Sequence, residues 1–248
     1  MSITWSRSIG YTGSIIQARA SAFSRVAHRS RIETLLNKLL YGTVVVIVLT
    51  ALCVVGLDVQ VAEFILLRTG RAFLFSHTVA SLPDLLLATV IAVCSASWAG
   101  YFLLVQKGTS DRSTRLFRVL GTALPIAFVA KGVLKWIFGR VDTRTWLVHP
   151  ETYSFHWFHG GVNFQGFPSG HMLVFTPLFL AMWNYSPRLR PVVLAGWLGL
   201  AVALLVTEYH FLGDLIAGSY LGYLIYFGVD RASATWSGSL GGSADQGR

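Results

Sequence analysis

The stretch that decides the fold, residues 191–229, reads PVVLAGWLGLAVALLVTEYHFLGDLIAGSYLGYLIYFGV. It consists of two apolar runs, about 191–209 and 213–229, which meet at the cluster His210-Phe211-Leu212-Gly213-Asp214. A helix that crosses a membrane needs roughly 20 mostly apolar residues. We therefore predict two consecutive membrane helices, with the histidine and the aspartate in the turn between them.

Four further apolar runs of similar length precede this stretch, at about 38–57, 82–105, 117–138 and 170–186. The chain of 248 residues is 54% hydrophobic and only 12% charged, whereas a soluble domain contains roughly 25% charged residues. This composition argues against a water-soluble globule and favours a chain solvated mainly by lipid. We predict an all-α, polytopic membrane protein built as a six-transmembrane-helix bundle.

The distribution of basic residues predicts the orientation in the membrane. The net charge is +9, but no basic stripe with interleaved aromatic residues indicates a nucleic-acid partner. With the N-terminus inside, the outer segments would hold only Arg68, Arg71, Arg140 and Arg144. Because positively charged segments are retained on the cytoplasmic side, we expect a multi-pass protein of a bacterial inner (cytoplasmic) membrane with both termini in the cytoplasm.

Three regions are expected along the chain. Residues 1–37 form a basic cytoplasmic arm, residues 38–230 the membrane domain, and residues 231–248, rich in Ser, Gly and Ala, a disordered cytoplasmic tail. The arm has many Ser and Arg and little acid, which is also typical of an organelle transit peptide. Cys53 and Cys94 lie in apolar runs and are expected to pack as core residues.

Two outer loops are long enough to contribute to a site. Residues 58–77 carry an apolar and aromatic pattern that could lie as an interfacial helix. Residues 139–169 are rich in Trp, His and Gly, so this loop either lines a site or forms an interfacial aromatic belt.

Two lysines, Lys131 and Lys135, lie inside a predicted membrane helix. Four residues apart, they share one face of that helix. A charge in this position costs several kcal/mol and usually faces the bundle interior or a wet cavity. The alternative is that the side chains reach up to the lipid headgroups.

Two histidine clusters lie at the ends of the last three predicted helices, one at the start of the fourth and one between the fifth and the sixth. In Pro168-Ser169-Gly170-His171, small residues at a helix start leave backbone N–H groups free to bind an anion, and His171 projects into this cradle. In the second cluster, Asp214 can accept the Nδ1–H of His210, which leaves Nε2 free as a nucleophile or base. Either cluster by itself could be purely structural.

The topology brings these clusters to one face. The end of the third predicted helix, the start of the fourth and the turn between the last two all emerge outside, so six residues are expected at one depth: Lys135, Arg140, Ser169, His171, His210 and Asp214. Cationic and amide groups that bind an oxyanion, one nucleophilic histidine and one acidic histidine favour phosphoryl transfer through a covalent histidine. Because the nearby acids Asp142, Glu151 and Glu208 are scattered, we expect no metal and no cofactor.

These motifs resemble those of the type 2 phosphatidic acid phosphatase superfamily of membrane lipid phosphate phosphatases, whose signature is K-x6-RP, then PSGH, then SR-x5-H-x3-D. The similarity covers roughly residues 82–229. It implies that His171 protonates the leaving group and that His210 attacks phosphorus with support from Asp214. The residues that it implies bind phosphate are Lys135, Ser169 and Gly170.

The sequence departs from the signature at two places. Asp142-Thr143 stands where the first motif has Arg-Pro, although Arg140 matches an extra arginine often found there. Ala203-Leu204 stands where the third motif has Ser-Arg. The candidates to replace the two missing arginines are Arg140, Arg144 and Lys131.

The leading expectation is a metal-independent membrane phosphatase that acts on a lipid phosphate monoester or diphosphate at the outer, periplasmic leaflet through a phosphohistidine. The alternatives are a lipid phosphotransferase that uses the same site and an inactive member that only binds lipid. The substrate could be a membrane phospholipid, lipid A or a polyprenyl phosphate. The sequence leaves the oligomeric state open.

Overall fold

The computed structural model describes the chain over residues 8–70, 82–109, 111–161 and 163–241, and its side chains over residues 29–30, 32–70, 85–109, 111–161 and 163–234. Within these ranges every secondary-structure element is a helix. The described residues contain no strand, and Arg140 and Phe155 form an isolated antiparallel bridge. The prediction of an all-α fold is therefore confirmed.

The chain divides into two compact units, residues 1–47 and residues 48–248. The first unit consists of most of α1 (Ser8–Leu52). The second unit contains the last turn of α1, a π-helix η1 (Cys53–Leu57), helix α2 (Asp58–Thr69) and all later elements. The outer loop predicted at 58–77 thus begins as a helix, and its residues 71–77 lie outside the described part of the chain.

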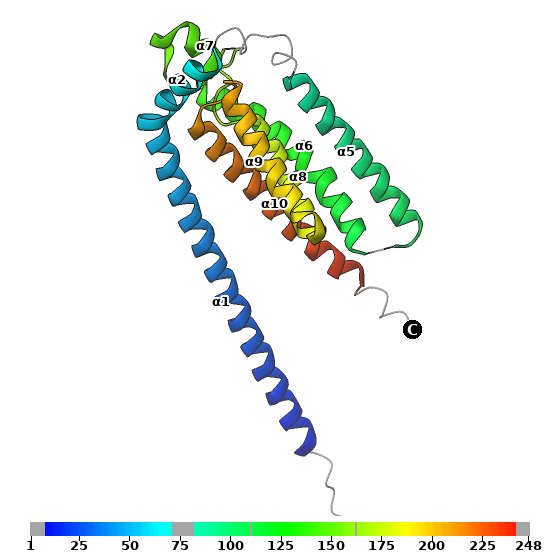
Figure 1. Ribbon diagram of the computed structural model, residues 1–248. Coiled ribbons are helices and arrows are strands. Elements are labelled where there is room, and N and C mark those ends of the chain that lie inside the picture. Colours follow the sequence, from blue (N-terminus) through cyan, green and yellow to red (C-terminus); the bar gives the residue numbers. More distant parts are fainter. Residues whose placement is uncertain (1–7, 71–81, 110, 162, 242–248) are drawn as a thin grey trace, which may run out of the picture. The chain divides into compact units, whose positions relative to one another are not determined.

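Five helices of the second unit form a bundle: α5 (Leu82–Gln106), α6 (Arg112–Phe138), α8 (Gly170–Tyr185), α9 (Arg190–Val206) and α10 (Leu212–Gly241). Helix α8 packs against α6, α9 and α10, and α5 packs along α6 (Figure 1). Most residues of α8 from Gly170 to Pro177 are buried. Helix α8 therefore forms the centre of the bundle.

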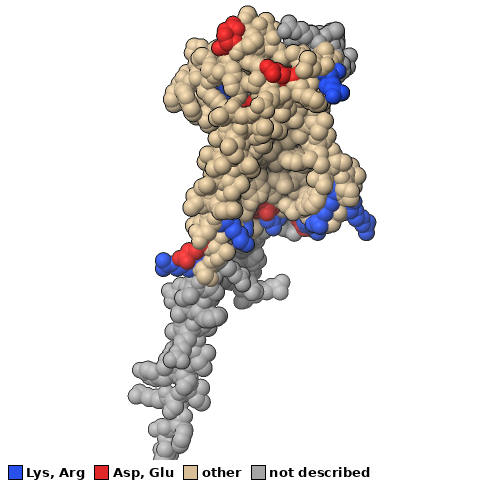
Figure 2. All heavy atoms as spheres, turned by 60° about the vertical axis from the view of Figure 1, so that its left-hand side comes forward, with Lys and Arg blue, Asp and Glu red and all other residues tan. Residues whose placement is uncertain are grey.

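Five stretches of the described residues are long and apolar enough to cross a membrane: Ile32–Thr69, Leu85–Gln106, Arg112–Phe138, Pro187–Val206 and Leu212–Ala234. The fourth predicted crossing, at 170–186, folds as α8, which has only 16 residues and is about 24 Å long. Figure 2 shows a broad band without charged side chains between two ends that carry Lys, Arg, Asp and Glu. Five membrane-spanning helices are thus supported, and a sixth crossing remains a prediction.

The connections between the bundle helices are short except for the one that precedes α8. That segment contains α7 (Thr143–Val148) and a 3-10 turn η2 (Pro150–Thr152), whereas a 3-10 turn η3 (Pro187–Leu189) leads into α9. Helix α10 continues to Gly241, past residue 231 where the tail was expected to become disordered. One physical reason is that Arg118 Nη2 donates to the Ser233 carbonyl oxygen at 2.7 Å, which holds the helix against α6 just beyond residue 231.

Glycines allow α10 to approach α8 closely. A Cβ atom on Gly218 would lie 2.5 Å from the Ser169 carbonyl oxygen, and one on Gly222 would lie 2.7 Å from the Leu173 carbonyl oxygen. The same close approach lets the Ser169 N–H donate to the Asp214 carbonyl oxygen at 3.0 Å. Packing between these two helices therefore fixes the start of α8 against the start of α10.

We expect Gly222→Ala to lower the unfolding temperature of the purified protein in detergent, because overpacking against the α8 backbone costs about 1–3 kcal/mol. Gly228→Ala is the matched control, since it lies on the same helix and a Cβ atom there meets nothing within 4 Å. The control gains the intrinsic helix preference of alanine, about 1 kcal/mol. Equal unfolding temperatures for the two variants would contradict the close packing.

Candidate functional site

The predicted site residues meet where α6 ends and where α8 and α10 begin. Lys135 lies in the last turn of α6, which ends at Gly139 with a left-handed φ of 52°. The Gly139 N–H donates to the Lys135 carbonyl oxygen at 2.9 Å, and the His156 N–H donates to the Gly139 carbonyl oxygen at 3.0 Å. A Cβ atom at Gly139 would collide with the His156 carbonyl oxygen, so glycine lets the loop fold back onto the end of α6.

Both lysines lie against the amino end of α8. A Cβ atom on Gly170 would collide with the side chain of Lys131 and lie 3.4 Å from Cε of Lys135. Ser169 caps the helix, because its Oγ accepts the Met172 N–H at 3.4 Å. The lysine stems therefore pass over the glycine at the point where the helix dipole favours negative charge.

Two histidine rings pack edge to face next to this helix start. The ring centroids of His171 and His210 are 5.7 Å apart. His210 is buried, and its Nδ1 lies 2.9 Å from the carbonyl oxygen of Gly166. Because a carbonyl oxygen can only accept a hydrogen bond, Nδ1 carries the proton and Nε2 has the free lone pair. Burial also lowers the pKa of His210 below its usual range, which favours the neutral, nucleophilic ring.

The hydrogen-bond partner of His210 differs from the one expected. Asp214 Oδ2 lies 3.8 Å from His210 Nδ1, which is too long for a hydrogen bond. The Asp214 carboxylate instead accepts from Arg140 Nη1 at 2.5 Å and from the Phe211 N–H at 2.9 Å. The prediction of a direct His210–Asp214 hydrogen bond is therefore wrong, because the carboxylate is engaged by the arginine and the turn backbone.

Arg140 lies in a buried ion cluster. Its Nη2 pairs with Asp58 Oδ2 at 2.8 Å, while its Nη1 pairs with Asp214, and the side chains of all three are at most 1% exposed. Asp58 also accepts the Gly213 N–H at 2.8 Å. Burying charges is tolerated when they are paired and hydrogen-bonded in this way. This arrangement fits an organising role for Arg140 better than the phosphate-binding role that the sequence suggested.

Aromatic side chains complete the burial of the Arg140 guanidinium. Its Cζ lies 4.6 Å from the ring centroid of Phe211 and 5.1 Å from those of Tyr153 and Phe155. Tyr153 Oη accepts from Arg140 at 2.6 Å and donates to the Val54 carbonyl oxygen at 2.6 Å. The Trp-rich loop predicted at 139–169 thus contributes rings that enclose the ion cluster as well as rings that lie at the surface.

Sequence reasoning missed Asp58 as part of this site. The partners Asp58 and Arg140 are 82 residues apart along the chain, so no local spacing links them. The one available signal is an aspartate that directly follows the apolar run 38–57, since a carboxylate buried at a helix end needs a cationic partner.

Arg144 and Glu208 form a second polar group beside His210. The Arg144 guanidinium donates to the Thr207 carbonyl oxygen at 3.0 and 3.3 Å and lies 3.9 Å from the ring centroid of Tyr209. Glu208 has a left-handed φ of 52° and is 1% exposed, and its Oε1 has no hydrogen-bond partner. Burial raises the pKa of Glu208 to about 8, although Arg144 acts in the opposite direction. Sequence reasoning did not place Glu208 at the site, because nothing local marks it as buried.

The position of the missing third-motif arginine lies in an apolar cluster. Leu204 is buried against Met172 and Leu215. Among the described residues, no group of three or more His, Cys, Asp and Glu is arranged to hold a metal ion. Lys131 and Lys135 are the cationic side chains that lie against Gly170, and the arrangement can bind an oxyanion next to two histidine rings.

We expect Asp58→Asn to destabilise the protein by about 2 kcal/mol, because the neutral amide cannot replace the carboxylate that accepts from both Arg140 Nη2 and the Gly213 N–H. Chemical denaturation in detergent measures this change. Glu63→Gln is the control, since Glu63 lies on the same helix and is exposed. Equal stability of the two variants would mean that Arg140 does not depend on Asp58.

Glu208 should make stability depend on pH. Its pKa in the folded protein, about 8, lies above the ordinary value of 4.5, so the folded state holds a proton that the unfolded chain has lost. Stability should therefore fall as the pH rises from 4.5 to 8. Thermal unfolding at several pH values should show this loss in the wild type and in the exposed control Glu151→Gln, and a smaller loss in Glu208→Gln. Identical profiles for all three proteins would refute the assignment.

Comparisons with known proteins agree with the motif analysis. Neither the curated proteins nor the solved structures gave a match. The family model of the PAP2 superfamily, which is the superfamily indicated by the sequence motifs, matches residues 116–236. That segment contains both lysines, the PSGH run, the two histidines and Asp214. This match over residues 116–236 supports membership of the PAP2 superfamily.

Proposed function

We propose that the protein is an integral membrane phosphatase that hydrolyses a lipid phosphate monoester or diphosphate through a phosphohistidine on His210. Membership of the PAP2 superfamily indicates a hydrolase of the phosphatase type. The observation that carries the finer proposal is the placement of two histidine rings, 5.7 Å apart, beside a helix start that is covered by two lysines.

The first step is attack on phosphorus by Nε2 of His210. The N–P bond forms as the bond from phosphorus to the leaving oxygen breaks. His171, which the negative charge of the bound phosphate keeps protonated, gives its proton to that oxygen. The Gly166 carbonyl oxygen holds the opposite ring nitrogen in place at 2.9 Å. Asp214, 3.8 Å from Nδ1, stabilises the positive ring that forms.

The second step returns the enzyme to its starting state. The neutral His171 takes a proton from water, the water oxygen attacks phosphorus, and the N–P bond breaks to release inorganic phosphate. His171 is protonated again at the end of this step, and His210 is neutral again. The two histidines thus complete the cycle with no net change in protons on the protein.

The phosphate oxygens are proposed to bind at the amino end of α8. Lys131 and Lys135 supply positive charge there, and the backbone N–H groups that follow Ser169 supply donors. Neither lysine can bind phosphate in the bidentate geometry of the arginine that the third motif usually provides. Arg144 is engaged with Thr207 and Tyr209 in this structure, so we assign it a supporting role beside Glu208.

The proposed location is the outer leaflet of a bacterial inner membrane, with six crossings and both termini in the cytoplasm. The support is the asymmetry of basic residues along the sequence. The α6 carboxyl end and the α8 and α10 amino ends, which hold the site, lie on the side that this rule assigns to the exterior. A lipid phosphate at the membrane surface could reach the two lysines from there.

The experiment that tests the function is inorganic phosphate release from lipid substrates by the purified protein in detergent with a chelator present. The panel consists of phosphatidic acid, phosphatidylglycerol phosphate, lipid A and undecaprenyl diphosphate. We expect His210→Ala to abolish both turnover and trapped phosphoenzyme. His171→Ala should slow the release of a poor leaving group more than that of an activated aryl phosphate, because only the acid step depends on the leaving group.

His149→Ala is the matched control, because His149 is an exposed histidine in the loop that precedes α8. It should leave turnover unchanged. Transfer of the phosphoryl group to another lipid, with no release of inorganic phosphate, would identify a phosphotransferase. Retained activity in His210→Ala would refute the phosphohistidine, and activity that needs added Mg²⁺ would refute a metal-independent mechanism.

A further inference from the structure

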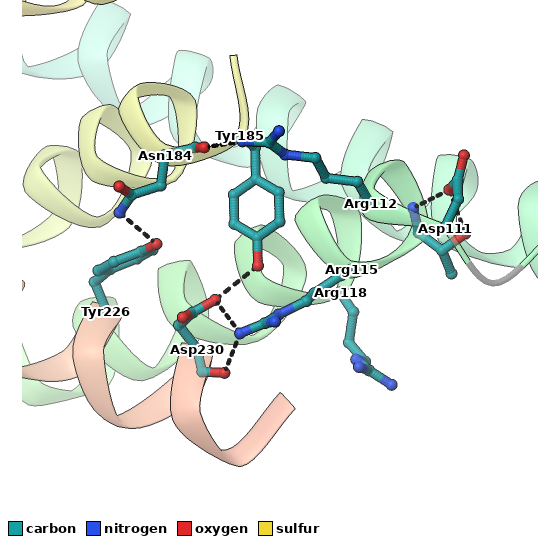
Figure 3. A pocket seen from close by; sticks show the side chains of 9 residues that line it. Asp111, Arg112, Arg115, Arg118, Asn184, Tyr185, Tyr226 and Asp230 are labelled. Atoms are coloured by element: carbon teal, nitrogen blue, oxygen red, sulfur yellow. Dashed lines mark hydrogen bonds and ion pairs between the residues drawn. The ribbon is translucent and has the colours of Figure 1, made fainter. Parts of the chain in front are cut away.

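A second polar site lies at the opposite end of the bundle. A pocket of about 720 Å³ is formed by the first turns of α6, the end of α8 and the later part of α10 (Figure 3). It is lined by Arg112, Arg115 and Arg118 and by Asn184, Tyr185 and Asp230, among others. Arg115 precedes Lys135 by 20 positions on α6, which separates this pocket from the candidate catalytic site by about 30 Å.

The pocket carries an excess of positive charge that its own acids do not cancel. Asp230 pairs with Arg115 at 2.9 Å and accepts the Tyr185 hydroxyl at 2.7 Å. Asp111 accepts the backbone N–H groups of Ser113 and Thr114 at 3.0 and 3.1 Å, and so caps α6. Both carboxylates are therefore engaged, and two further arginines lie beside them.

The arginines are held in fixed positions. Arg112 donates to the Asn184 carbonyl oxygen, and Arg118 donates to the Ser233 carbonyl oxygen at 2.7 Å. The guanidinium carbons of Arg112 and Arg115 lie 5.8 and 5.9 Å from the ring centroid of Tyr185, and Figure 3 shows this ring reaching from the Arg112 side toward Asp230. Aromatic and carbonyl contacts thus orient the guanidinium groups before any ligand arrives.

One donor in this cluster is buried without a partner. Arg115 Nε has no hydrogen-bond partner although it is shielded from solvent. Because solvent does not reach this atom, a ligand in the pocket would be bound by the terminal guanidinium nitrogens instead. Phosphate oxygens, like carboxylate oxygens, match the fork of a guanidinium group.

We propose that this pocket binds a phosphate-bearing anion, as a site separate from the candidate catalytic centre. Its volume lies within the range of ligand pockets, roughly 300–1,000 Å³. The pocket also lies where the candidate spans Arg112–Phe138 and Leu212–Ala234 have their charged ends, the depth at which lipid phosphates are found. The phosphate can belong to a lipid headgroup or be free in solution, and the chemistry of recognition is the same.

The test compares two probes on the full-length protein. Retention of phosphatidylglycerol relative to phosphatidylcholine is followed by native mass spectrometry, and binding of inorganic phosphate is followed by calorimetry. Both use a Lys131→Met/Lys135→Met background, which removes the lysine charges of the candidate catalytic site. Arg112→Gln/Arg118→Gln keeps the Arg115–Asp230 pair and should weaken binding of whichever probe occupies the pocket by about tenfold or more.

Arg188→Gln/Arg190→Gln is the matched control, because it removes two exposed arginines from the same end of the bundle that do not line the pocket. It should bind like the parent protein. If the double variant does not fold, the single variant Arg112→Gln, which changes an exposed residue, replaces it in both binding measurements. Loss of lipid retention identifies a headgroup as the ligand, and loss of phosphate binding alone identifies a free ion. Equal binding of both probes by pocket and control variants would overturn the proposal.

Discussion

The buried pairing of Arg140 with Asp58 and Asp214 is the constraint on which the site depends. It joins the segment after α6 to the start of α2 and the start of α10. Because an unpaired charge in this environment would be costly, the three segments have to meet together. The two carboxylates also accept the N–H groups of Phe211 and Gly213. The ion cluster therefore fixes the turn that carries His210, although it does not touch the ring.

Gly166 transmits this constraint to the nucleophile. Its N–H donates to the Arg140 carbonyl oxygen at 2.9 Å, and its own carbonyl oxygen faces His210 Nδ1 at 2.9 Å. A Cβ atom on Gly166 would lie 2.5 Å from the Val141 carbonyl oxygen, so the residue fits only because it has no side chain. The N–H and the carbonyl group of this glycine thus link the backbone of the buried arginine to the His210 ring, which we propose attacks phosphorus.

The sequence predicted the parts of the site that follow from topology. The order of apolar runs was sufficient to bring Lys135, His171 and His210 to one end of the bundle. The order of the runs could not predict the contact between Asp58 and Arg140, which depends on packing between distant segments. It also could not predict that His210 Nδ1 bonds to the Gly166 carbonyl oxygen and not to Asp214. The six apolar runs all became helices, but α8, with 16 residues, is too short to be identified as a crossing by its length.

The short length of α8 has a consequence for how charges are placed along the bundle. A helix of 16 residues spans about 24 Å, less than the roughly 30 Å of a hydrocarbon core. If α8 crosses the membrane, at least one of its ends lies below the headgroups, where bare backbone groups would be costly. Ser169 and the two lysines meet one end, and Arg112, which donates to the Asn184 carbonyl oxygen, meets the other. A central helix of this length therefore requires polar groups at both of its ends. The phosphate of a membrane lipid is well placed to reach these charges, because they lie below the level of the headgroups.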